Sequence, residues 1–342
     1  MKLILAFVHL GSNPSHTLNW YAEICRIKLP DCEVVLITDS PGSHFDFPGK
    51  VIGTQKSYPS SGISKFLRLN KAYKSVSGGY WRYTTERIFV LNELANYFDL
   101  NSPIVHIESD VLLTATQEML LEATKKISKT SIVRYSVESG IASILIAPTL
   151  GQLTADLQEL DKILVSNPQT RSDMSLLGLG LKADVLGELP RYSDENWRIE
   201  QSDNSYRVFD GAAIGQYLFG LDPVHTGNKQ ISGFLNENFD LPLDRCIWRI
   251  KTLDSGSQAQ LFIEYRDCTL IPLCIHIHSK ILIGPPNELD PQWIRYLQEA
   301  NGDSARTRGT FFKDEIHSKG ISLLNRIRLK ISRQRWERRN MS

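Results

Sequence analysis

The chain has few of the residues and segments from which several common protein classes are built. It has five cysteines in 342 residues, an odd number with no Cys-x-x-Cys pair, so neither a disulfide scaffold nor a thiolate zinc site is indicated. The opening MKLILAFVHL is too short for a signal sequence and lacks a small-residue cleavage site, and no other apolar run reaches membrane-spanning length. We therefore expect a cytoplasmic protein.

Several enzyme motifs are also missing from the sequence. It has no GxGxxG fingerprint and no GxxxxGK followed by Ser or Thr, which counts against dinucleotide-binding and P-loop enzymes. It also lacks the GxSxG nucleophile elbow and the HExxH zinc motif. The chemistry has to come from less common arrangements.

The chain has almost no net charge, yet its charge is unevenly placed. Thirty-nine basic and 38 acidic residues give +1, so no nucleic-acid partner is expected. Residues 319–342 contain eight basic residues and one acidic residue, which is +7 and leaves −6 for residues 1–318. We therefore divide the chain into a domain over residues 1–300 and a basic, partly helical tail over residues 301–342.

Short runs rich in β-branched residues alternate with helix-period segments in the first half: KLILAFVH, EVVLITD, SPIVHIESDVLL and SIVRYS. This alternation predicts an α/β fold with a mostly parallel central sheet and flanking helices. A helix is expected over residues 84–98, capped by Thr84 or Thr85, and a long loop over residues 189–209.

Two carboxylates, Glu108 and Asp110, follow an apolar strand in IVHIESDVLL, and Asp39 ends the strand VVLITD. Ligands of α/β sheets collect at the carboxyl ends of strands. Side chains two apart in an extended segment point the same way, and hard oxygen ligands suit Mg²⁺ or Mn²⁺. A solvated loop is the alternative.

The segment PLCIHIHSK places His276, His278 and Lys280 on one face if it is extended. Imidazole can complete a Mn²⁺ shell that carboxylates begin, and lysine can neutralise a departing phosphate. The alternative is an edge strand whose polar residues face water.

The block VFDGAAIGQYL places Asp210 before a predicted helix, either as its N-cap or beside a substrate. Glu237, within the polar triplet of GFLNENF, either contacts sugar hydroxyls or belongs to a turn. Lys65, Arg68 and Arg87 form a solvated basic face or hold a diphosphate near a helix start.

In order along the chain, these segments resemble nucleotide-sugar glycosyltransferases of the GT-A fold, in particular a set of bacterial and viral proteins of that type. The resemblance runs over about residues 1–285 and rests on LITD, the spacing of Trp81, Glu86 and Arg87, and the blocks HIESD, FDGAAIGQYLFGLDP, GFLNE and HIHSK. It implies a Rossmann-like GT-A domain with a mostly parallel sheet.

The resemblance also implies roles for individual residues. Asp110 would bind the metal, and Glu108 would replace the usual first Asp of a DxD motif. His278 or His276 would be the other metal ligand. Lys280 would accompany the diphosphate, and Asp39 would lie near the nucleoside.

The implied reaction is sugar transfer of the hexosyltransferase type, from a UDP- or GDP-sugar to a hydroxyl of a saccharide or lipid-linked saccharide, in surface polysaccharide or glycolipid synthesis. Mn²⁺ or Mg²⁺, with Lys280 and Arg87, would stabilise the leaving diphosphate. An inverting enzyme needs a general base, and Asp210 or Glu237 could serve. Two alternatives remain: a metal-dependent phosphoesterase or nucleotidyltransferase, and a non-catalytic sugar- or nucleotide-binding domain.

The basic tail has apolar residues at helical spacing, at Ile321, Leu324, Ile327 and Ile331. A basic amphipathic helix of this kind can lie on an anionic membrane surface. We therefore expect residues 319–342 to attach the protein peripherally to the inner face of the plasma membrane. The alternatives are docking on the acidic body and contact with nucleic acid.

Overall fold

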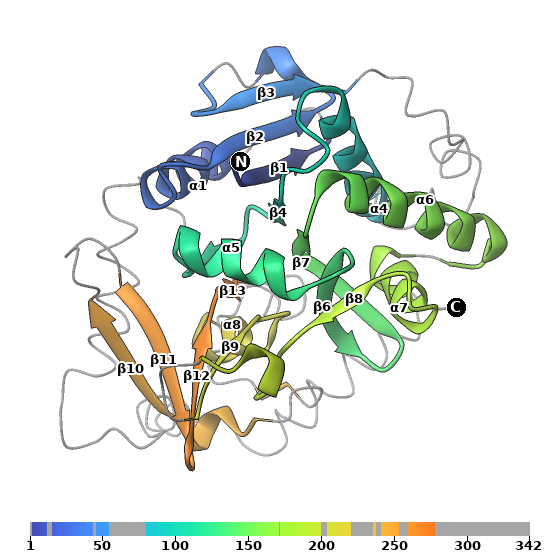
Figure 1. Ribbon diagram of the computed structural model, residues 1–342. Coiled ribbons are helices and arrows are strands. Elements are labelled where there is room, and N and C mark those ends of the chain that lie inside the picture. The colour runs from blue at the N-terminus through green and yellow to red at the C-terminus, as the bar shows by residue number, and fades with distance from the viewer. Residues whose placement is uncertain are drawn as a thin grey trace, which may run out of the picture.

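A computed structural model describes residues 2–11, 16–43, 46–54, 80–170, 172–199, 204–219, 235–236, 241–252 and 259–277. These residues form one large sheet with helices on both faces, a smaller sheet, and a strand pair between them (Figure 1). The tail over residues 301–342 and its expected membrane contact lie outside the described residues and stay predictions. No helix within these ranges is long and apolar enough to cross a membrane.

The large sheet has seven strands in the order β3-β2-β1-β4-β7-β6-β8. They are β1 (Ile4–His9), β2 (Glu33–Thr38), β3 (Lys50–Gly53), β4 (Ile104–Ile107), β6 (Ser131–Ser136), β7 (Ser139–Ala147) and β8 (Gly187–Leu189). Only β7 of these seven runs antiparallel to its neighbours β4 and β6. The expected α/β class with a mostly parallel sheet and flanking helices is confirmed.

Strand order reverses beside β1, because the chain passes from β1 to β2 and β3 on one side and then places β4 on the other. In open α/β sheets, the loops that leave the strands on either side of such a reversal diverge and open a crevice at the carboxyl edge. The residues that follow β1, β2 and β4 therefore lie where ligands of such sheets bind.

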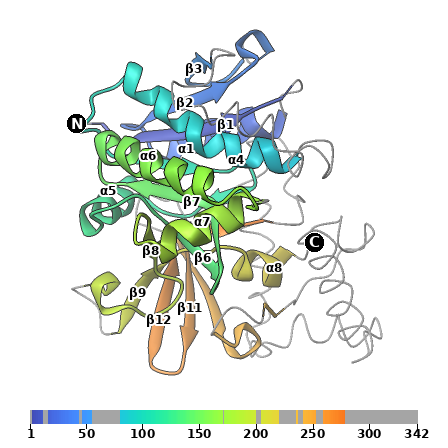
Figure 2. The same cartoon turned by 90° about the vertical axis from the view of Figure 1, so that its right-hand side faces the viewer.

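Helices cover both faces of the large sheet (Figure 2). One buried cluster joins the sheet to α1 (His16–Lys28) and α5 (Gln117–Lys126). The other joins it to α4 (Tyr80–Val90), the 3-10 turn η3 (Leu91–Asn96), α6 (Leu150–Ser166) and α7 (Asp173–Lys182). Burial on both faces explains why the inner strands are mostly apolar instead of strictly alternating.

Side-chain caps fix where three of these helices begin. Thr116, Thr149 and Ser172 each accept a hydrogen bond from a backbone N–H three residues later, at the start of α5, α6 and α7. Such a cap satisfies one of the amide donors that a first helical turn leaves without a partner. The first residue of α7, Asp173, belongs to the candidate site.

The helix expected over residues 84–98 begins earlier than the sequence indicated. It starts at Tyr80, so Thr84 and Thr85 lie inside α4 and are buried, and neither is a cap. Beyond Val90 the chain tightens into the 3-10 turn η3. The apolar stripe was correct, since Ile88 is buried in the core, but the threonines belong to the packed face.

The second half is more regular than expected. The predicted loop over residues 189–209 contains the 3-10 turn η4 (Glu195–Trp197) and β9 (Ser205–Val208). A four-stranded sheet has the order β10-β11-β12-β9, and its core includes α8 (Ala213–Phe219) and the 3-10 turn η5 (Leu243–Arg245). Its other strands are β10 (Ile247–Thr252), β11 (Ala259–Tyr265) and β12 (Cys268–Pro272). Strand β9 was missed because it is only four residues long.

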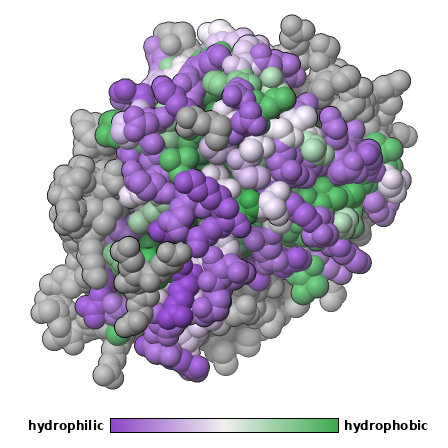
Figure 3. Space-filling model, in the orientation of Figure 1, coloured by the Kyte–Doolittle hydropathy of each residue, from purple (hydrophilic) through white to green (hydrophobic). Residues whose placement is uncertain are grey.

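A two-stranded pair, β5 (Val111–Leu113) with β13 (Cys274–His276), connects the two halves. The remaining described turn is η1 (Pro41–Ser43). On the face seen in Figure 3 most residues are hydrophilic and the hydrophobic ones are scattered between them. Scattered exposed apolar side chains are ordinary on globular proteins, so this face indicates no particular partner.

Candidate functional site

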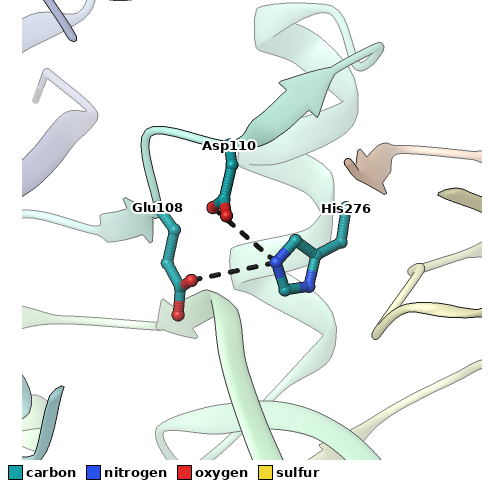
Figure 4. Close-up of side chains that lie close together, drawn as sticks. All are labelled: Glu108, Asp110 and His276. Carbon is teal, nitrogen blue, oxygen red and sulfur yellow. Dashed lines mark ion pairs between the residues drawn. The ribbon is translucent and has the colours of Figure 1, made fainter. Parts of the chain in front are cut away.

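Two carboxylates lie in the turn between β4 and β5. Glu108 follows the last residue of β4, Asp110 precedes the first residue of β5, and the N–H of Val111 donates to the carbonyl of Glu108 at 3.2 Å. The acids follow strand β4, as expected, but the extended conformation assumed for residues 108–110 is wrong, because the chain turns at Ser109. The two carboxylates nevertheless face one site, as Figure 4 shows.

A histidine from far along the chain completes this site. Strand β13 pairs antiparallel with β5 so that His276 lies opposite Val111, and the N–H of Ile277 donates to the Asp110 carbonyl at 2.7 Å. His276 Nε2 lies 3.6 Å from Asp110 Oδ1 and 3.9 Å from Glu108 Oε2 (Figure 4). The pairing of β13 with β5 therefore brings His276 to the two acids.

The other nitrogen of this imidazole is held by the backbone. His276 Nδ1 lies 2.7 Å from the carbonyl oxygen of Gly211, which can only accept, so Nδ1 carries the proton. In the neutral ring this places the lone pair of Nε2 toward Glu108 and Asp110. A backbone carbonyl that fixes the tautomer and direction of a histidine is typical of metal ligands.

The three side chains form a set that fits a divalent cation. One ligand atom from each of Glu108, Asp110 and His276 lies within 4.8 Å of the other two. Two carboxylate oxygens with one imidazole nitrogen suit Mn²⁺, and the carboxylates alone suit Mg²⁺. Three protein ligands leave further coordination positions to water or phosphate oxygens.

The carboxylates and the histidine strongly affect one another's protonation. Burial acts to lower the pKa of His276, but the charges of Asp110 and Glu108 outweigh it and raise that pKa to about 9. Burial raises the pKa of Glu108, and Asp110 raises it further, while Arg87 and His276 act in the opposite direction. The pair of carboxylates thus attracts a cation, which is the imidazolium when the ring holds a second proton.

Asp210 lies next to this site and is fully buried. Its Oδ1 accepts hydrogen bonds from the N–H groups of Ala212 and Ile214, and its Oδ2 accepts from those of Gly215 and His276, all between 2.8 and 3.0 Å. This is the capping role that the sequence allowed. Its role as a general base stays a prediction.

The start of α8 approaches β13 too closely for a side chain. A Cβ on Gly215 would clash with the backbone carbonyl oxygen of His276. Glycine is therefore required where the helix passes the strand. Together with Asp210, this contact holds β13 at a fixed distance from α8.

Arg87 reaches the site from α4. A terminal nitrogen of Arg87 lies 2.5 Å from Glu108 Oε1 and 3.2 Å from Asp173 Oδ2. The contact with Asp173 is a hydrogen bond, and the contact with Glu108 is an ion pair without good hydrogen-bond alignment. Its expected contact with a diphosphate stays a prediction.

Asp39 lies at the same edge of the sheet, directly after β2. Its Oδ1 accepts a hydrogen bond from the N–H of Gly11 at 3.0 Å, which ties the loop after β1 to the loop after β2. Gly11 has a φ of 120°, a conformation that favours glycine. The expected nucleoside contact of Asp39 stays a prediction.

Five of the predicted site residues lie outside the described residues: Lys65, Arg68, Glu237, His278 and Lys280. Their assigned roles stay predictions. His276, the other candidate histidine, lies beside the acids.

Two contributors to the site were not anticipated from the sequence. Asp173 holds Arg87, and it is buried as the first residue of α7. An acid in the first turn of a helix is common, so it gave no functional signal. Gly211 supplies the carbonyl that orients His276. Because every residue has a backbone carbonyl, the residue type could not indicate this contact.

Comparisons with known proteins give structural similarity at low identity. No family model matches the sequence, and no curated protein matches it either. The glycosyltransferase GlyE of Streptococcus pneumoniae TIGR4 is 13% identical with a TM-score of 0.41, over 93% of this chain and 64% of that one. Mouse xyloside xylosyltransferase 1 is 11% identical with a TM-score of 0.36, over 59% and 91%. The galactosyltransferase LgtC, in complex with donor and acceptor sugar analogs, is 10% identical with a TM-score of 0.33, over 70% and 84%.

Proposed function

We propose that this chain is a metal-dependent glycosyltransferase that moves a sugar from a nucleoside-diphosphate sugar to a hydroxyl acceptor. The observation that carries the proposal is the set of Glu108, Asp110 and His276, at the carboxyl edge of a mostly parallel sheet, beside the point where strand order reverses. The resemblance of HIESD, DGAAIGQYL and HIHSK to GT-A enzymes supports the same activity.

The three side chains would hold Mn²⁺ or Mg²⁺. A bound cation of this kind supplies positive charge against the negative charge that develops on a departing diphosphate. The chain's own part is to fix the two carboxylates in the turn between β4 and β5 and the imidazole at the end of β13. Because β5 and β13 are paired in register, the ligand set is formed before any substrate arrives.

The site also has the means to exclude wrong arrangements of its ligands. The carbonyl of Gly211 keeps His276 Nε2 directed at the carboxylates, and the Asp210 carboxylate holds the backbone of the same histidine. In this proposal Asp210 positions the metal centre. A general base for the acceptor hydroxyl is then expected from elsewhere, and Glu237 is the remaining candidate from the sequence.

Calorimetric titration with UDP and with GDP, each with and without Mn²⁺, tests the proposal. Wild-type protein is expected to bind one of the two nucleotides only when Mn²⁺ is present. Asp110→Asn is expected to lose that binding, because it removes a charged metal ligand. Asp31→Asn is the matched control, since Asp31 is an exposed carboxylate two residues before β2, at the opposite edge of the sheet.

Failure of both nucleotides to bind under every condition would contradict the proposal. Binding that is indifferent to Asp110 would favour a non-catalytic binding domain instead. Once the nucleotide is known, the matching nucleotide sugars are tested for transfer. Release of phosphate without any sugar acceptor would point to the phosphoesterase or nucleotidyltransferase alternative.

A further inference from the structure

Arg87 forms two ion pairs beside the candidate metal centre. Arg87, on α4, contacts Glu108 after β4 and Asp173 at the first residue of α7. The side chains of Arg87, Glu108 and Asp173 are 20%, 12% and 6% exposed, so all three are largely removed from water. Ion pairs that are this well buried have defined geometry, unlike exposed pairs, which contribute little.

The two oxygens of Glu108 have different neighbours. Oε1 lies 2.5 Å from the Arg87 guanidinium, and Oε2 lies 3.9 Å from His276 Nε2 on the opposite side. The carboxylate therefore offers one oxygen to the centre and turns the other away from it. With Arg87 in place, Glu108 would bind a cation through one oxygen only.

Arg87 is itself held from behind. Asp173 Oδ2 accepts a hydrogen bond from Arg87 at 3.2 Å, and Asp173 is fixed by the Ser172 cap at the start of α7. Helix α7 packs against β7, the neighbour of β4 in the large sheet. The arginine thus lies between the capped start of α7 and the end of the central strand β4.

The charges of this group match a divalent cation. Glu108, Asp110 and Asp173 contribute −3 and Arg87 contributes +1, so the group carries −2 when His276 is neutral. Without Arg87 the same group would carry −3, and Glu108 would have no partner for Oε1. Arginine suits this position because its planar guanidinium can contact two carboxylates at once.

We propose that Arg87 is a positioning residue of the metal centre, which acts through Glu108 and is held in turn by Asp173. It fixes which oxygen of the long glutamate side chain faces the cation. The role rests on the proposed function, because it presupposes that Glu108, Asp110 and His276 bind a metal. Partners that orient a metal ligand typically change metal affinity by roughly 10- to 100-fold when they are removed.

A double-mutant cycle on Mn²⁺ affinity tests this role. Free Mn²⁺ is followed by electron paramagnetic resonance in full-length wild-type protein, Arg87→Met, Glu108→Gln and the double variant. Arg87→Met is expected to weaken Mn²⁺ binding roughly tenfold or more. In the Glu108→Gln background the same change is expected to have no further effect, because Arg87 acts only through that carboxylate.

Arg82→Met is the matched control on the same helix. Arg82 pairs with the buried Glu86 at 2.9 Å, so its replacement breaks an ion pair with a buried carboxylate other than Glu108 or Asp173. It is expected to leave Mn²⁺ affinity within twofold of wild type. Arg87→Lys is expected to recover part of the affinity, since an ammonium supplies the charge without bridging both carboxylates.

Asp173→Asn provides a second test that leaves Arg87 and all three metal ligands intact, and a several-fold loss of Mn²⁺ affinity is expected. If Arg87→Met does not fold, Asp173→Asn alone tests the positioning role. Unchanged Mn²⁺ affinity in both variants, or a loss of equal size in the Glu108→Gln background, would overturn the positioning role alone. If wild-type protein binds no Mn²⁺, the metal centre is wrong and the role of Arg87 falls with it.

Discussion

Two acidic centres flank His276, and they satisfy their carboxylates in opposite ways. On one side, Asp210 accepts four backbone N–H groups from α8 and β13. On the other side, Glu108 and Asp110 face each other and the imidazole across a few ångströms. Asp210 is thus surrounded by backbone N–H donors, whereas Glu108 and Asp110 are surrounded by charged or ionisable side chains.

The difference would distinguish a structural acid, Asp210, from the proposed metal-binding pair, Glu108 and Asp110. A buried carboxylate with enough amide donors is stable where it is, and has no oxygen to offer an added cation. Two carboxylates in contact repel each other unless a positive charge lies between them. Residue type alone does not reveal which carboxylates have enough hydrogen-bond donors, because both centres are made of ordinary Asp and Glu residues.

The largest expected effect comes from removing the satisfied carboxylate. Asp210→Ala leaves four buried N–H groups without an acceptor, and each such group costs about 1 to 3 kcal/mol. We expect the free energy of unfolding to fall by at least about 3 kcal/mol, measured by urea denaturation without metal. Asp210→Asn should lose less, since one oxygen remains. An Asp210→Ala variant as stable as wild type would show that the four N–H groups do not depend on Asp210, so that the two centres do not differ.

The second effect concerns the carboxylate pair and requires a cation. Mn²⁺ at 100 times its dissociation constant should stabilise the wild-type fold by about 2.7 kcal/mol, because the ion binds the folded state only. Thermal unfolding with Mn²⁺ and after addition of EDTA measures this gain. Asp110→Asn should show no gain, whereas Asp31→Asn should match wild type. Equal stabilisation of both variants would place the metal elsewhere.

The third prediction concerns the contact that keeps the two centres apart. Gly215→Ala forces a Cβ against the carbonyl of His276, so β13 or α8 has to move. Overpacking of this kind costs about 1 to 3 kcal/mol. Gly42→Ala is the control, since a Cβ at Gly42 meets nothing within 4 Å. Denaturant unfolding of the two variants should differ, and equal stability would mean that the approach of α8 to β13 is not tight.

The smallest expected effect comes from Asp161, a carboxylate with a buried oxygen that accepts no hydrogen bond. Asp161 on α6 has a buried Oδ1 without a hydrogen-bond partner, and burial raises its pKa from 3.8 to about 6. A raised acid pKa favours folding below pH 3.8, and this contribution is lost as the pH rises through 6. Asp161→Asn should therefore stabilise the protein at pH 8 and not at pH 3.8. We expect about 1 kcal/mol after allowance for solvent screening, measured as the difference in unfolding free energy between these pH values.

The strands of the large sheet were predictable because their pattern is local. The segments KLILAFVH, EVVLITD and SIVRYS are apolar, β-branched runs, and each is a strand buried in the sheet. The turn at residues 108–110 was not predicted, since Glu108-Ser109-Asp110 contains no Gly or Pro and apolar residues lie on both sides of it. What ends β4 is the switch of partner from the large sheet to β13, which is a tertiary event.

The candidate site was predictable only in part for the same reason. Alternation in PLCIHIHSK placed His276 and His278 on one face and could not distinguish them. The pairing of β5 with β13 brings His276 to the acids, and His278 lies outside the described residues. The acids were found from their position after an apolar strand. Asp173 gave no signal, since its function comes from Arg87 reaching it across the packing of α4 on α7.

The pairing of β5 with β13 has a consequence for the order of events during synthesis. All seven strands of the large sheet lie in residues 4–189, a range that also contains Glu108 and Asp110, while the proposed nitrogen ligand comes at residue 276. A growing chain whose large sheet has already folded holds Glu108 and Asp110 without their histidine. If Glu108, Asp110 and His276 form the proposed metal centre, a growing chain has all three ligands only after β13 has emerged and paired with β5.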